Sequence, residues 1–492
     1  MVVSRSSLRA IAETFVNREY EIGIVEERVD IIRYGGTVFQ AVINFFGVVG
    51  IGKTMLVQET YKRMRAYGTP CALVDFARDD KYRHLIRGPV TLLEDVAASV
   101  ANRVELQPLD LQDLCASFWK EYRAEKPEPA LVEQRDRVTE AFLDYADRLL
   151  RHLERVPMVL LFDTTEAAEQ EVLDWLEREI FIPLLRTERV VIVIAGRVPW
   201  RLKEFQVRRR TYQYRLQPFG KEMAEKQLRD YRRLTPKIIE VTFGHPDANR
   251  RVVERVYELE QTEGPLDSQQ FDAHKAELVG ELVKGLIDDR VLADLPVEVR
   301  QALHLIAPLR QFDVSALRSL LIHFLPKEFE DKSGHYFLTM IRRMVETTVV
   351  QWDSARKGYA LDPTARRMLA LNMQLHRQED FVAVHEEAIA LYNDWTHHIP
   401  EARSRYMIEK LYHTAEVLRA TGEPGSVIGE RLAEELLQYL QEFYGGEEEI
   451  ATMAGLERLV QEFNGDEELD QVSGGRLETL INTVKKFQPA LT

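Results

Sequence analysis

The stretch FFGVVGIGKTM, residues 45–55, decides how the rest of the sequence is interpreted. It matches the pattern G-x-x-x-x-G-K-[ST] of a phosphate-binding loop. Glycines allow backbone N–H groups to approach phosphate oxygens closely, at the start of a helix whose dipole favours negative charge. We expect Lys53 to reach the β- and γ-phosphates of a nucleotide and Thr54 to ligate Mg²⁺. The residues of this loop expected to contact the nucleotide are Gly47, Gly50, Ile51, Gly52, Lys53, Thr54 and Met55.

The composition is that of an ordinary globular protein. The 492 residues exceed one hydrophobic core, so three or four domains are expected. Two cysteines, Cys71 and Cys115, form neither a disulfide framework nor a metal cluster, which fits a reducing compartment. The N-terminus lacks a signal pattern and no apolar run is long enough to span a membrane, so we expect a cytoplasmic protein that has no membrane partner.

The net charge of −15 is concentrated towards the C-terminus. Residues 421–492 contain 15 Asp and Glu against 5 Lys and Arg, which gives this segment a net charge of −10. Such an acidic segment disfavours nonspecific binding to nucleic acid by the tail itself.

Short apolar runs alternate with helical patterns over the first 220 residues. The expected strands cover 38–46, 70–77, 156–166, 189–196 and 212–219. Because each strand is almost entirely apolar, a parallel sheet covered by helices on both faces is predicted. We therefore predict an α/β nucleotide-binding domain over 1–220, with a helical insertion at about 95–150.

The remainder is predicted to be mainly helical. Residues 221–288 read as a helical lid domain. Three helices and a short hairpin around Ser354, Lys357 and Gly358 predict a winged helix-turn-helix domain over 289–373. Residues 374–492 are expected to form an all-helical region that serves as a sensor or an adaptor.

Three charged residues follow the expected strands at the edge where parallel sheets bind ligands. Asp163 ends the run VLLFD and is expected to hold Mg²⁺. Glu166 follows three residues later and could orient or deprotonate an attacking water, although acids also favour helix starts. Arg197 ends VIVIAGR, where a cation can sense the γ-phosphate.

These motifs, in this order, resemble the STAND class of P-loop NTPases, which includes NACHT-like and NB-ARC-like signalling ATPases. FVNRE (15–19) resembles an adenine-side motif, LLFDTTE a Mg²⁺ motif, VIAGR a sensor motif, and GHP (244–246) a G-x-P signature. YALDPTARRML (359–369) is similar to the end of the family's winged helix, and IEKLYH (408–413) to a helix after it. The resemblance covers about residues 12–415.

The resemblance implies additional nucleotide contacts. Phe15, Val16 and Arg18 would lie on the adenine side, and Pro246 near the base and ribose. Where the family often has a histidine that contacts ADP, this sequence has Asp362, which would repel a diphosphate, so no such role is assigned to it.

The resemblance also implies a molecular switch that uses ATP, ADP and Mg²⁺. ADP would hold the closed state, a trigger and ATP would open it, and opened copies would self-associate, with slow hydrolysis resetting the switch. Only 14 residues precede FVNRE, so we expect the effector, in bacterial defence or signal transduction, on a separate chain.

Two other classes of protein remain open. One is a winged-helix DNA-binding transcriptional regulator, which would use Arg342, Arg343, Arg356 and Lys357. In that case Arg342 and Arg343 would contact DNA. Their alternation with apolar residues also fits an ordinary amphipathic helix that faces water. The other class is an AAA+-like ATPase, which would need an arginine finger that the sequence does not identify.

Overall fold

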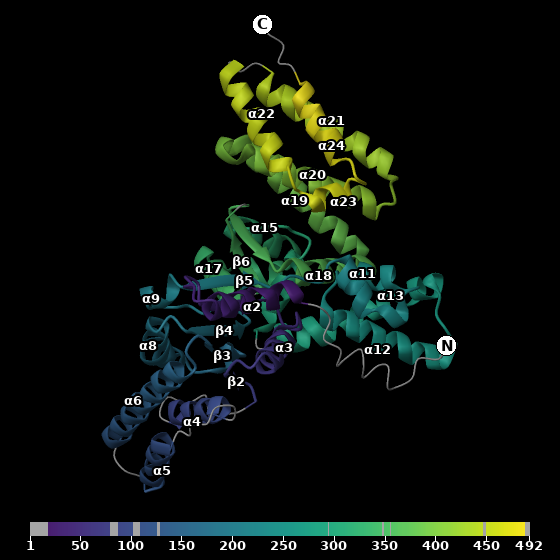
Figure 1. Cartoon of the computed structure of the whole chain (residues 1–492). Helices are drawn as coiled ribbons and strands as arrows, with labels where there is room; N and C mark the ends of the chain where they lie inside the picture. Colours follow the sequence, from purple (N-terminus) through teal and green to yellow (C-terminus); the bar gives the residue numbers. More distant parts are fainter. Residues whose placement is uncertain are drawn as a thin grey trace. The chain divides into compact units, whose positions relative to one another are not determined.

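The computed structural model describes residues 18–78, 87–101, 109–124, 128–293, 295–346, 349–354, 356–445 and 449–487. The chain forms two compact units (Figure 1). The first comprises Met1–Thr235 and Gly244–Pro265, and the second comprises Pro236–Phe243 and Leu266–Thr492. The residues of the expected lid, 221–288, are divided between these units, and the four-domain division stays a prediction.

The first unit is built on five parallel strands, as the sequence predicts. The strands are β1 (Val42–Phe46), β2 (Cys71–Asp75), β3 (Met158–Asp163), β4 (Val190–Gly196) and β5 (Thr211–Arg215). Their order in the sheet is β2-β3-β4-β1-β5, and every pair of neighbours is parallel. All five strands therefore point their carboxyl ends towards the same edge.

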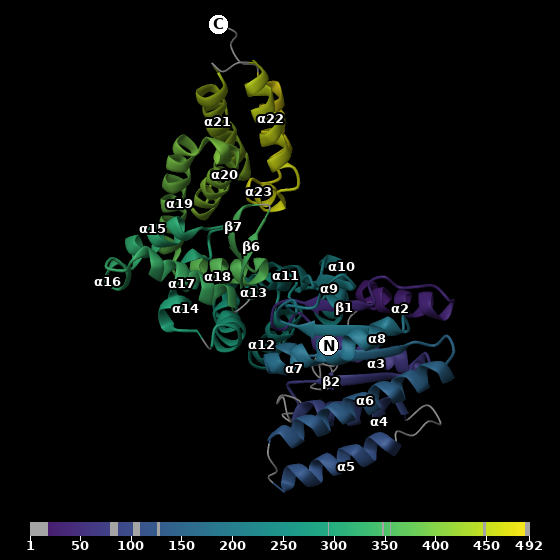
Figure 2. The same ribbon diagram turned by 90° about the vertical axis from the view of Figure 1, so that its left-hand side faces the viewer.

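Helices cover this sheet. The first unit contains α2 (Glu19–Arg33), α3 (Lys53–Ala66), α4 (Arg87–Ala101), α5 (Leu109–Arg123), α6 (Glu128–His152), η2 (Thr165–Ala167), α7 (Gln170–Trp175), η3 (Leu176–Phe181), α8 (Ile182–Arg186), α9 (Phe205–Arg208), α10 (Lys221–Gln227), η4 (Arg229–Tyr231) and α12 (Pro246–Glu263). Helices α4, α5 and α6 form the long connection between β2 and β3 and lie beyond the edge strand β2 (Figure 2).

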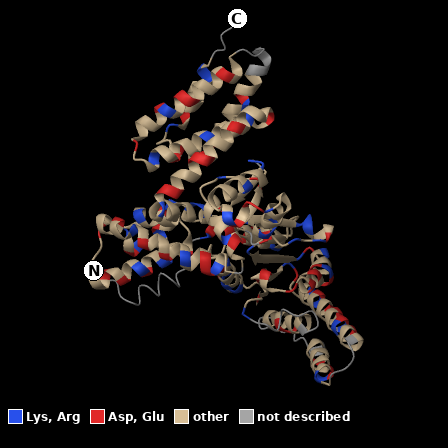
Figure 3. Cartoon of the chain, turned by 180° about the vertical axis from the view of Figure 1, so that it is seen from behind, with Lys and Arg blue, Asp and Glu red and all other residues tan. Residues whose placement is uncertain are grey.

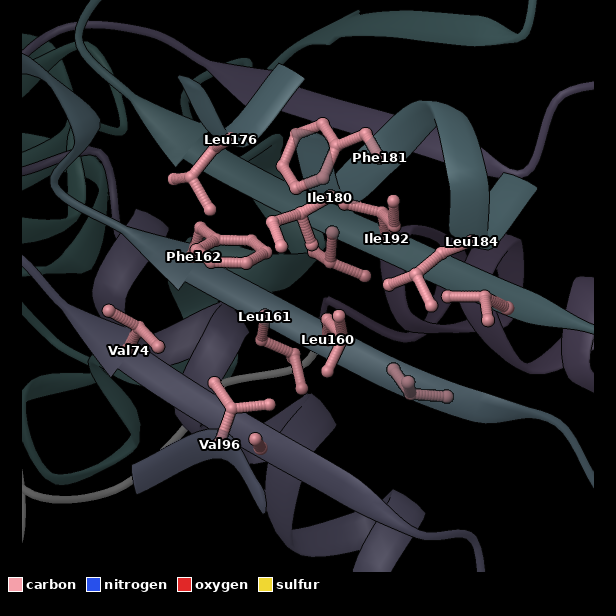
Figure 4. Packing of buried hydrophobic residues seen from close by; sticks show 14 of the residues in the cluster. Val74, Val96, Leu160, Leu161, Phe162, Leu176, Ile180, Phe181, Leu184 and Ile192 are labelled. Carbon is pink, nitrogen blue, oxygen red and sulfur yellow. The ribbon is translucent and has the colours of Figure 1, made fainter. Parts of the chain in front are cut away.

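The central strands are buried on both faces. All six residues of β3 and all seven of β4 are buried, which explains their continuous apolar sequences. The η3–α8 segment packs on the sheet through Leu176, Ile180 and Phe181, next to Phe162 of β3 (Figure 4). The rings of Phe162 and Phe181 lie 5.4 Å apart, so this face is closed by aromatic contacts.

Over its described residues, the second unit is helical apart from one hairpin. Its elements are α11 (Thr235–Thr242), α13 (Ser268–Leu282), η5 (Val283–Val291), α14 (Val297–Ile306), α15 (Val314–Phe324), α16 (Pro326–Phe329), α17 (Gly334–Glu346), β6 (Val350–Asp353), β7 (Gly358–Leu361), α18 (Pro363–His376), α19 (Gln378–His398), η6 (Pro400–Ala402), α20 (Arg403–Ala420), α21 (Gly425–Tyr444), α22 (Glu449–Phe463), α23 (Glu467–Val472) and α24 (Leu477–Lys486). Strands β6 and β7 pair antiparallel.

Asp362 has a local structural role in this unit. Its Oδ1 accepts hydrogen bonds from the backbone N–H groups of Thr364 (3.0 Å) and Ala365 (3.1 Å), so it caps the N-terminus of α18. An aspartate is among the residues that suit an N-cap best, which accounts for its presence after β7. None of the described helices is long and apolar enough to cross a membrane.

Part of the acidic C-terminal segment neutralises a buried arginine. Arg310, which is 1% exposed, makes two hydrogen bonds with Glu409 of α20 (3.0 and 3.1 Å) and two with Asp466 (both 2.7 Å). The guanidinium also lies 4.3 Å from the ring centre of Tyr412. Acidic and basic residues are likewise interspersed along the C-terminal helices (Figure 3). Some of the acidic residues of the C-terminal segment therefore neutralise a buried charge inside the fold.

We expect Arg310→Ala to destabilise the second unit by about 3–5 kcal/mol, because two buried carboxylates would lose their counter-charge. Thermal unfolding followed by circular dichroism would show a fall in the melting temperature. Arg342→Ala on α17 is the control, because Arg342 is exposed and its removal should change stability by no more than about 0.5 kcal/mol. Equal melting temperatures for the two variants would contradict the importance of the buried cluster.

Candidate functional site

The phosphate-loop motif lies between β1 and α3, as the sequence predicts. Gly47, Gly50 and Gly52 all have positive φ angles (154°, 80° and 99°), which glycine adopts without steric cost. A Cβ atom at Gly50 would lie 2.7 Å from the Cβ of Asp247, so the tight packing there also requires glycine. The first N–H groups of α3 lack acceptors inside the helix and are directed at the loop.

Lys53 is held inside the curve of this loop. Its Nζ donates to the carbonyl oxygens of Gly47 (2.7 Å) and Val48 (2.9 Å). Burial lowers the pKa of Lys53 to about 8, an effect that the nearby carboxylates of Glu166 and Asp163 oppose. A nearby phosphate would stabilise the charged form of this ammonium group and so offset the free-energy cost of its burial.

Thr54 and Asp163 are brought together at the ends of α3 and β3. The Thr54 hydroxyl hydrogen-bonds to the Asp163 carboxylate, and the Thr164 N–H donates to Oδ1 of Asp163 at 2.9 Å. Asp163 is 2% exposed, and burial raises its pKa to about 6 although the bond from Thr54 opposes the rise. A hydroxyl and a carboxylate side by side are oxygen donors that suit Mg²⁺, so the donor set fits the expected metal.

Glu166 and Arg197 are paired with one another. The Nε of Arg197 lies 3.1 Å from Oε1 of Glu166, and the Arg197 backbone N–H donates to Oε2 at 3.1 Å. The side chain of Arg197 is 44% exposed and that of Glu166 is 22% exposed, so the pair faces solvent on one side. While this ion pair is formed, both carboxylate oxygens of Glu166 contact Arg197, so neither is free to accept a hydrogen bond from an attacking water.

Arg18 contacts both the phosphate-binding loop and helix α2. Its guanidinium donates to the carbonyl oxygen of Ile51 (2.8 Å) and to Oε1 of Glu21 (2.9 Å), and it lies 4.8 Å from the ring centre of Phe219. The Ile51 side chain is fully buried, which places it in the hydrophobic core. The other two expected adenine-side residues, Phe15 and Val16, lie outside the described residues.

The GHP motif connects the loop to helix α12. The ring Nδ1 of His245 accepts from the Ala248 N–H (3.2 Å), so the ring proton lies on Nε2, which donates to the carbonyl oxygen of Val49 (3.0 Å). Pro246 is buried at the first position of α12. Gly244, at φ +73°, accepts from the Phe219 N–H at 2.9 Å.

Sequence reasoning missed three residues at this site. His245 and Asp247 contact the loop through α12, and Asp75 ends β2 in register with Asp163, where its charge contributes to the raised pKa of that carboxyl. The terminal acid of CALVD was a usable signal for Asp75, because parallel neighbours end at the same edge. Met55, which was predicted, lies in the first turn of α3 and is 36% exposed.

The sequence matches no protein-family model and no curated protein. Similar solved structures include Cdc6p of Pyrobaculum aerophilum, with 14% identity over 77% of this chain and 100% of that chain and a TM-score of 0.38. Drosophila ORC bound to DNA has 14% identity over 77% and 99% of the two chains, with a TM-score of 0.35. The RuvB Holliday junction branch migration motor of Thermotoga maritima has 14% identity over 72% and 95%, with a TM-score of 0.33.

The chain's own core is a five-stranded parallel sheet with a phosphate-binding loop motif between β1 and α3.

We expect Gly244→Ala to destabilise the first unit by about 2–4 kcal/mol, because the added Cβ would lie 2.1 Å from the Phe219 carbonyl oxygen. Gly68→Ala is the matched control, since Gly68 has the same φ (+73°) and belongs to the same unit but has no atom within 4 Å of the added Cβ. It should cost about 1 kcal/mol, the strain of the backbone alone. Urea unfolding followed by tryptophan fluorescence would separate the two, and an equal loss would rule out the steric explanation.

Proposed function

We propose that this chain is an ATP- and ADP-binding molecular switch of the STAND type that hydrolyses ATP slowly. One observation carries the proposal: Lys53, the Thr54–Asp163 pair and the Arg197–Glu166 pair all lie at the carboxyl edge of one parallel sheet. Each group has the chemistry that a nucleoside triphosphate needs at this place.

Each residue has a distinct task in the proposed mechanism. The loop N–H groups bind the phosphates, and Lys53 neutralises charge at the β and γ positions. Thr54 and Asp163 would hold Mg²⁺, which supplies charge neutralisation between the β- and γ-phosphates. Asp163 must lose its proton to act as a ligand, so its raised pKa of about 6 makes metal binding weaken as the pH falls below that value.

The Glu166–Arg197 pair would detect the γ-phosphate of a bound nucleotide. Arg197 can contact either the Glu166 carboxylate or a γ-phosphate with the same face of its guanidinium, but not both fully. When Arg197 turns to the phosphate, Glu166 becomes free to orient an attacking water. Hydrolysis reverses the exchange.

The second unit would complete the switch. We propose that α14, α15, α17 and the β6–β7 hairpin form a winged-helix domain, and that α19–α24 form a sensor or adaptor. With ADP the protein would be closed; ATP and a trigger would open it and allow self-association. The effector, in bacterial defence or signalling, would be a separate polypeptide.

A DNA-binding regulator is the second candidate, and one observation favours it. Arg342 and Arg343 are both exposed on α17, and Trp352 on the adjacent hairpin is 56% exposed. The same helix buries Met340 and Met344, which is also what an ordinary amphipathic helix does. An AAA+-like ATPase, which would turn over ATP faster and as a ring, is the third candidate.

We expect the solution mass to change with nucleotide. Light scattering after size exclusion should give a monomer with ADP and a discrete larger assembly with ATP and Mg²⁺, and Lys53→Ala should remain monomeric in both. Arg197→Ala should bind ATP but remain monomeric with ATP and Mg²⁺. A wild-type monomer in both states would contradict an ATP-driven switch, and binding to duplex DNA that weakens steeply with salt and is lost in Arg342→Glu would favour the regulator.

Nucleotide binding should also take up a proton at alkaline pH. Because burial lowers the pKa of Lys53 to about 8, most of the protein has a neutral lysine at pH 9, and a bound phosphate would restore its charge. Calorimetry of Mg–ADP binding in two buffers with different ionisation enthalpies should show close to one proton taken up at pH 9 and about none at pH 7. Equal proton uptake at the two pH values would show that Lys53 does not contact the phosphates.

A further inference from the structure

The second unit contains a cavity that the proposed nucleotide chemistry does not use. Its volume is about 300 Å³, and its walls come from α11, α13, α18, α19, α20 and α23. A cavity of this size holds a small organic molecule. It belongs entirely to the unit formed by Pro236–Phe243 and Leu266–Thr492, whereas the phosphate loop belongs to the other unit.

The charged lining of this cavity has more cations than carboxylates. Lys275, Arg366, Arg367 and Arg419 face three glutamates. The glutamate pairings leave many donors over: Arg367 makes two hydrogen bonds to one oxygen of Glu468, and each guanidinium carries five N–H groups. The surplus of positive charge and of N–H donors favours an anion, and guanidinium groups fit a phosphate or a carboxylate.

Two buried polar atoms on the wall lack partners among the described residues. One is Oε2 of Glu468, whose Oε1 takes the bonds from Arg366 and Arg367, and the other is Nε2 of His385. His385 is 1% exposed, and its Nδ1 lies 2.6 Å from Nδ1 of His413. Since buried polar groups are nearly always paired, these two atoms indicate that a ligand with its own hydrogen-bonding groups completes the wall.

The uncharged part of the lining combines apolar and aromatic residues with two glutamines, Gln374 and Gln471. Phe243 and Phe381 contribute rings, and the Arg367 guanidinium lies 5.8 Å from the centre of the Phe243 ring. A planar ring can therefore lie against this wall while an attached anion meets the arginines.

We propose that this cavity is a binding site for a small aromatic phosphate ester, of mononucleotide size or less, with the phosphate at Arg367 and Arg419 and a ring donor group at Glu468. The site is separate from the phosphate loop. Its wall joins α18 to α23, so the ligand would contact the ion pairs that attach the acidic tail to α18. Such a ligand is suited to act as a trigger of this unit.

The test is calorimetric titration of the full chain with 4-aminophenyl phosphate, whose ring amine can donate to Glu468, in the Lys53→Ala background so that the phosphate loop does not contribute. Saturable binding is expected, at least about tenfold tighter than for inorganic phosphate or benzoate. Arg367→Ala and Arg419→Ala should each weaken binding about tenfold. Both side chains are partly exposed (39% and 44%), so these variants should fold, which circular dichroism would verify.

Arg318→Ala, which removes an exposed arginine of the same unit, is the matched control and should leave binding unchanged. Leu371→Trp, which fills the cavity without removing a charge, should abolish binding. No saturable binding of 4-aminophenyl phosphate up to ~10 mM would overturn the proposal, because that is weaker than any specific site of this kind. Equal affinity for inorganic phosphate would overturn the aromatic part, and binding that is insensitive to Arg367 and Arg419 would place the ligand elsewhere.

Discussion

The parallel pairing of β1, β4 and β3 is the constraint on which the nucleotide unit depends. Because β4 lies between the other two, the ends of three strands distant in sequence meet at one edge. The phosphate loop, Arg197 and Asp163 follow these strands in that spatial order. An antiparallel neighbour would have sent one of these groups to the opposite edge, about 20 Å away for strands of five to seven residues.

Burial of charge gives this edge its chemical character. Lys53 and Asp163 have pKa values displaced towards neutrality, in opposite directions, chiefly because burial disfavours the charged form of each. The cost is acceptable only if a partner of opposite charge restores the charged forms. A magnesium nucleotide contains both partners, an anionic phosphate for the lysine and a cation for the aspartate. The same reasoning applies to the Glu166–Arg197 pair: in the proposed mechanism Arg197 would exchange its internal partner, Glu166, for the γ-phosphate of the nucleotide.

The second unit contains buried arginines that are neutralised by carboxylates of the same unit. Arg310 and Arg366 are buried, and the carboxylates of Glu409, Asp466 and Glu468 neutralise them. Burial opposes ionisation of Glu468, but its arginine neighbours outweigh this effect and lower its pKa to about 2. That carboxylate therefore adds stability above its ordinary pKa of 4.5, and this contribution is lost as the pH falls from 4.5 towards 2. An acidic tail that looks like a solvated segment in the sequence is thus partly an internal counter-charge.

Local signals were enough to predict the α/β core. The apolar runs and the motif at 45–55 identified the five strands, the loop and helix α3, because strand periodicity and the glycines of a phosphate loop are properties of short segments. The ends of the strands differed by up to four residues, as at β1, which begins at Val42 and not at residue 38. Asp163, Glu166 and Arg197 could be named for the same reason: each lies at the end of a recognisable strand or within three residues of it.

Only the tertiary structure showed which of these groups contact one another. The pairing of Glu166 with Arg197, the contact of His245 with the loop, and the neutralisation of Arg310 by Asp466 join residues that are 31 to 196 positions apart. No local pattern encodes such contacts, because they depend on how whole elements pack. The sequence by itself therefore determined the type of core and the residues available at its edge. Long-range packing decided their partners, their degree of burial and hence their charge.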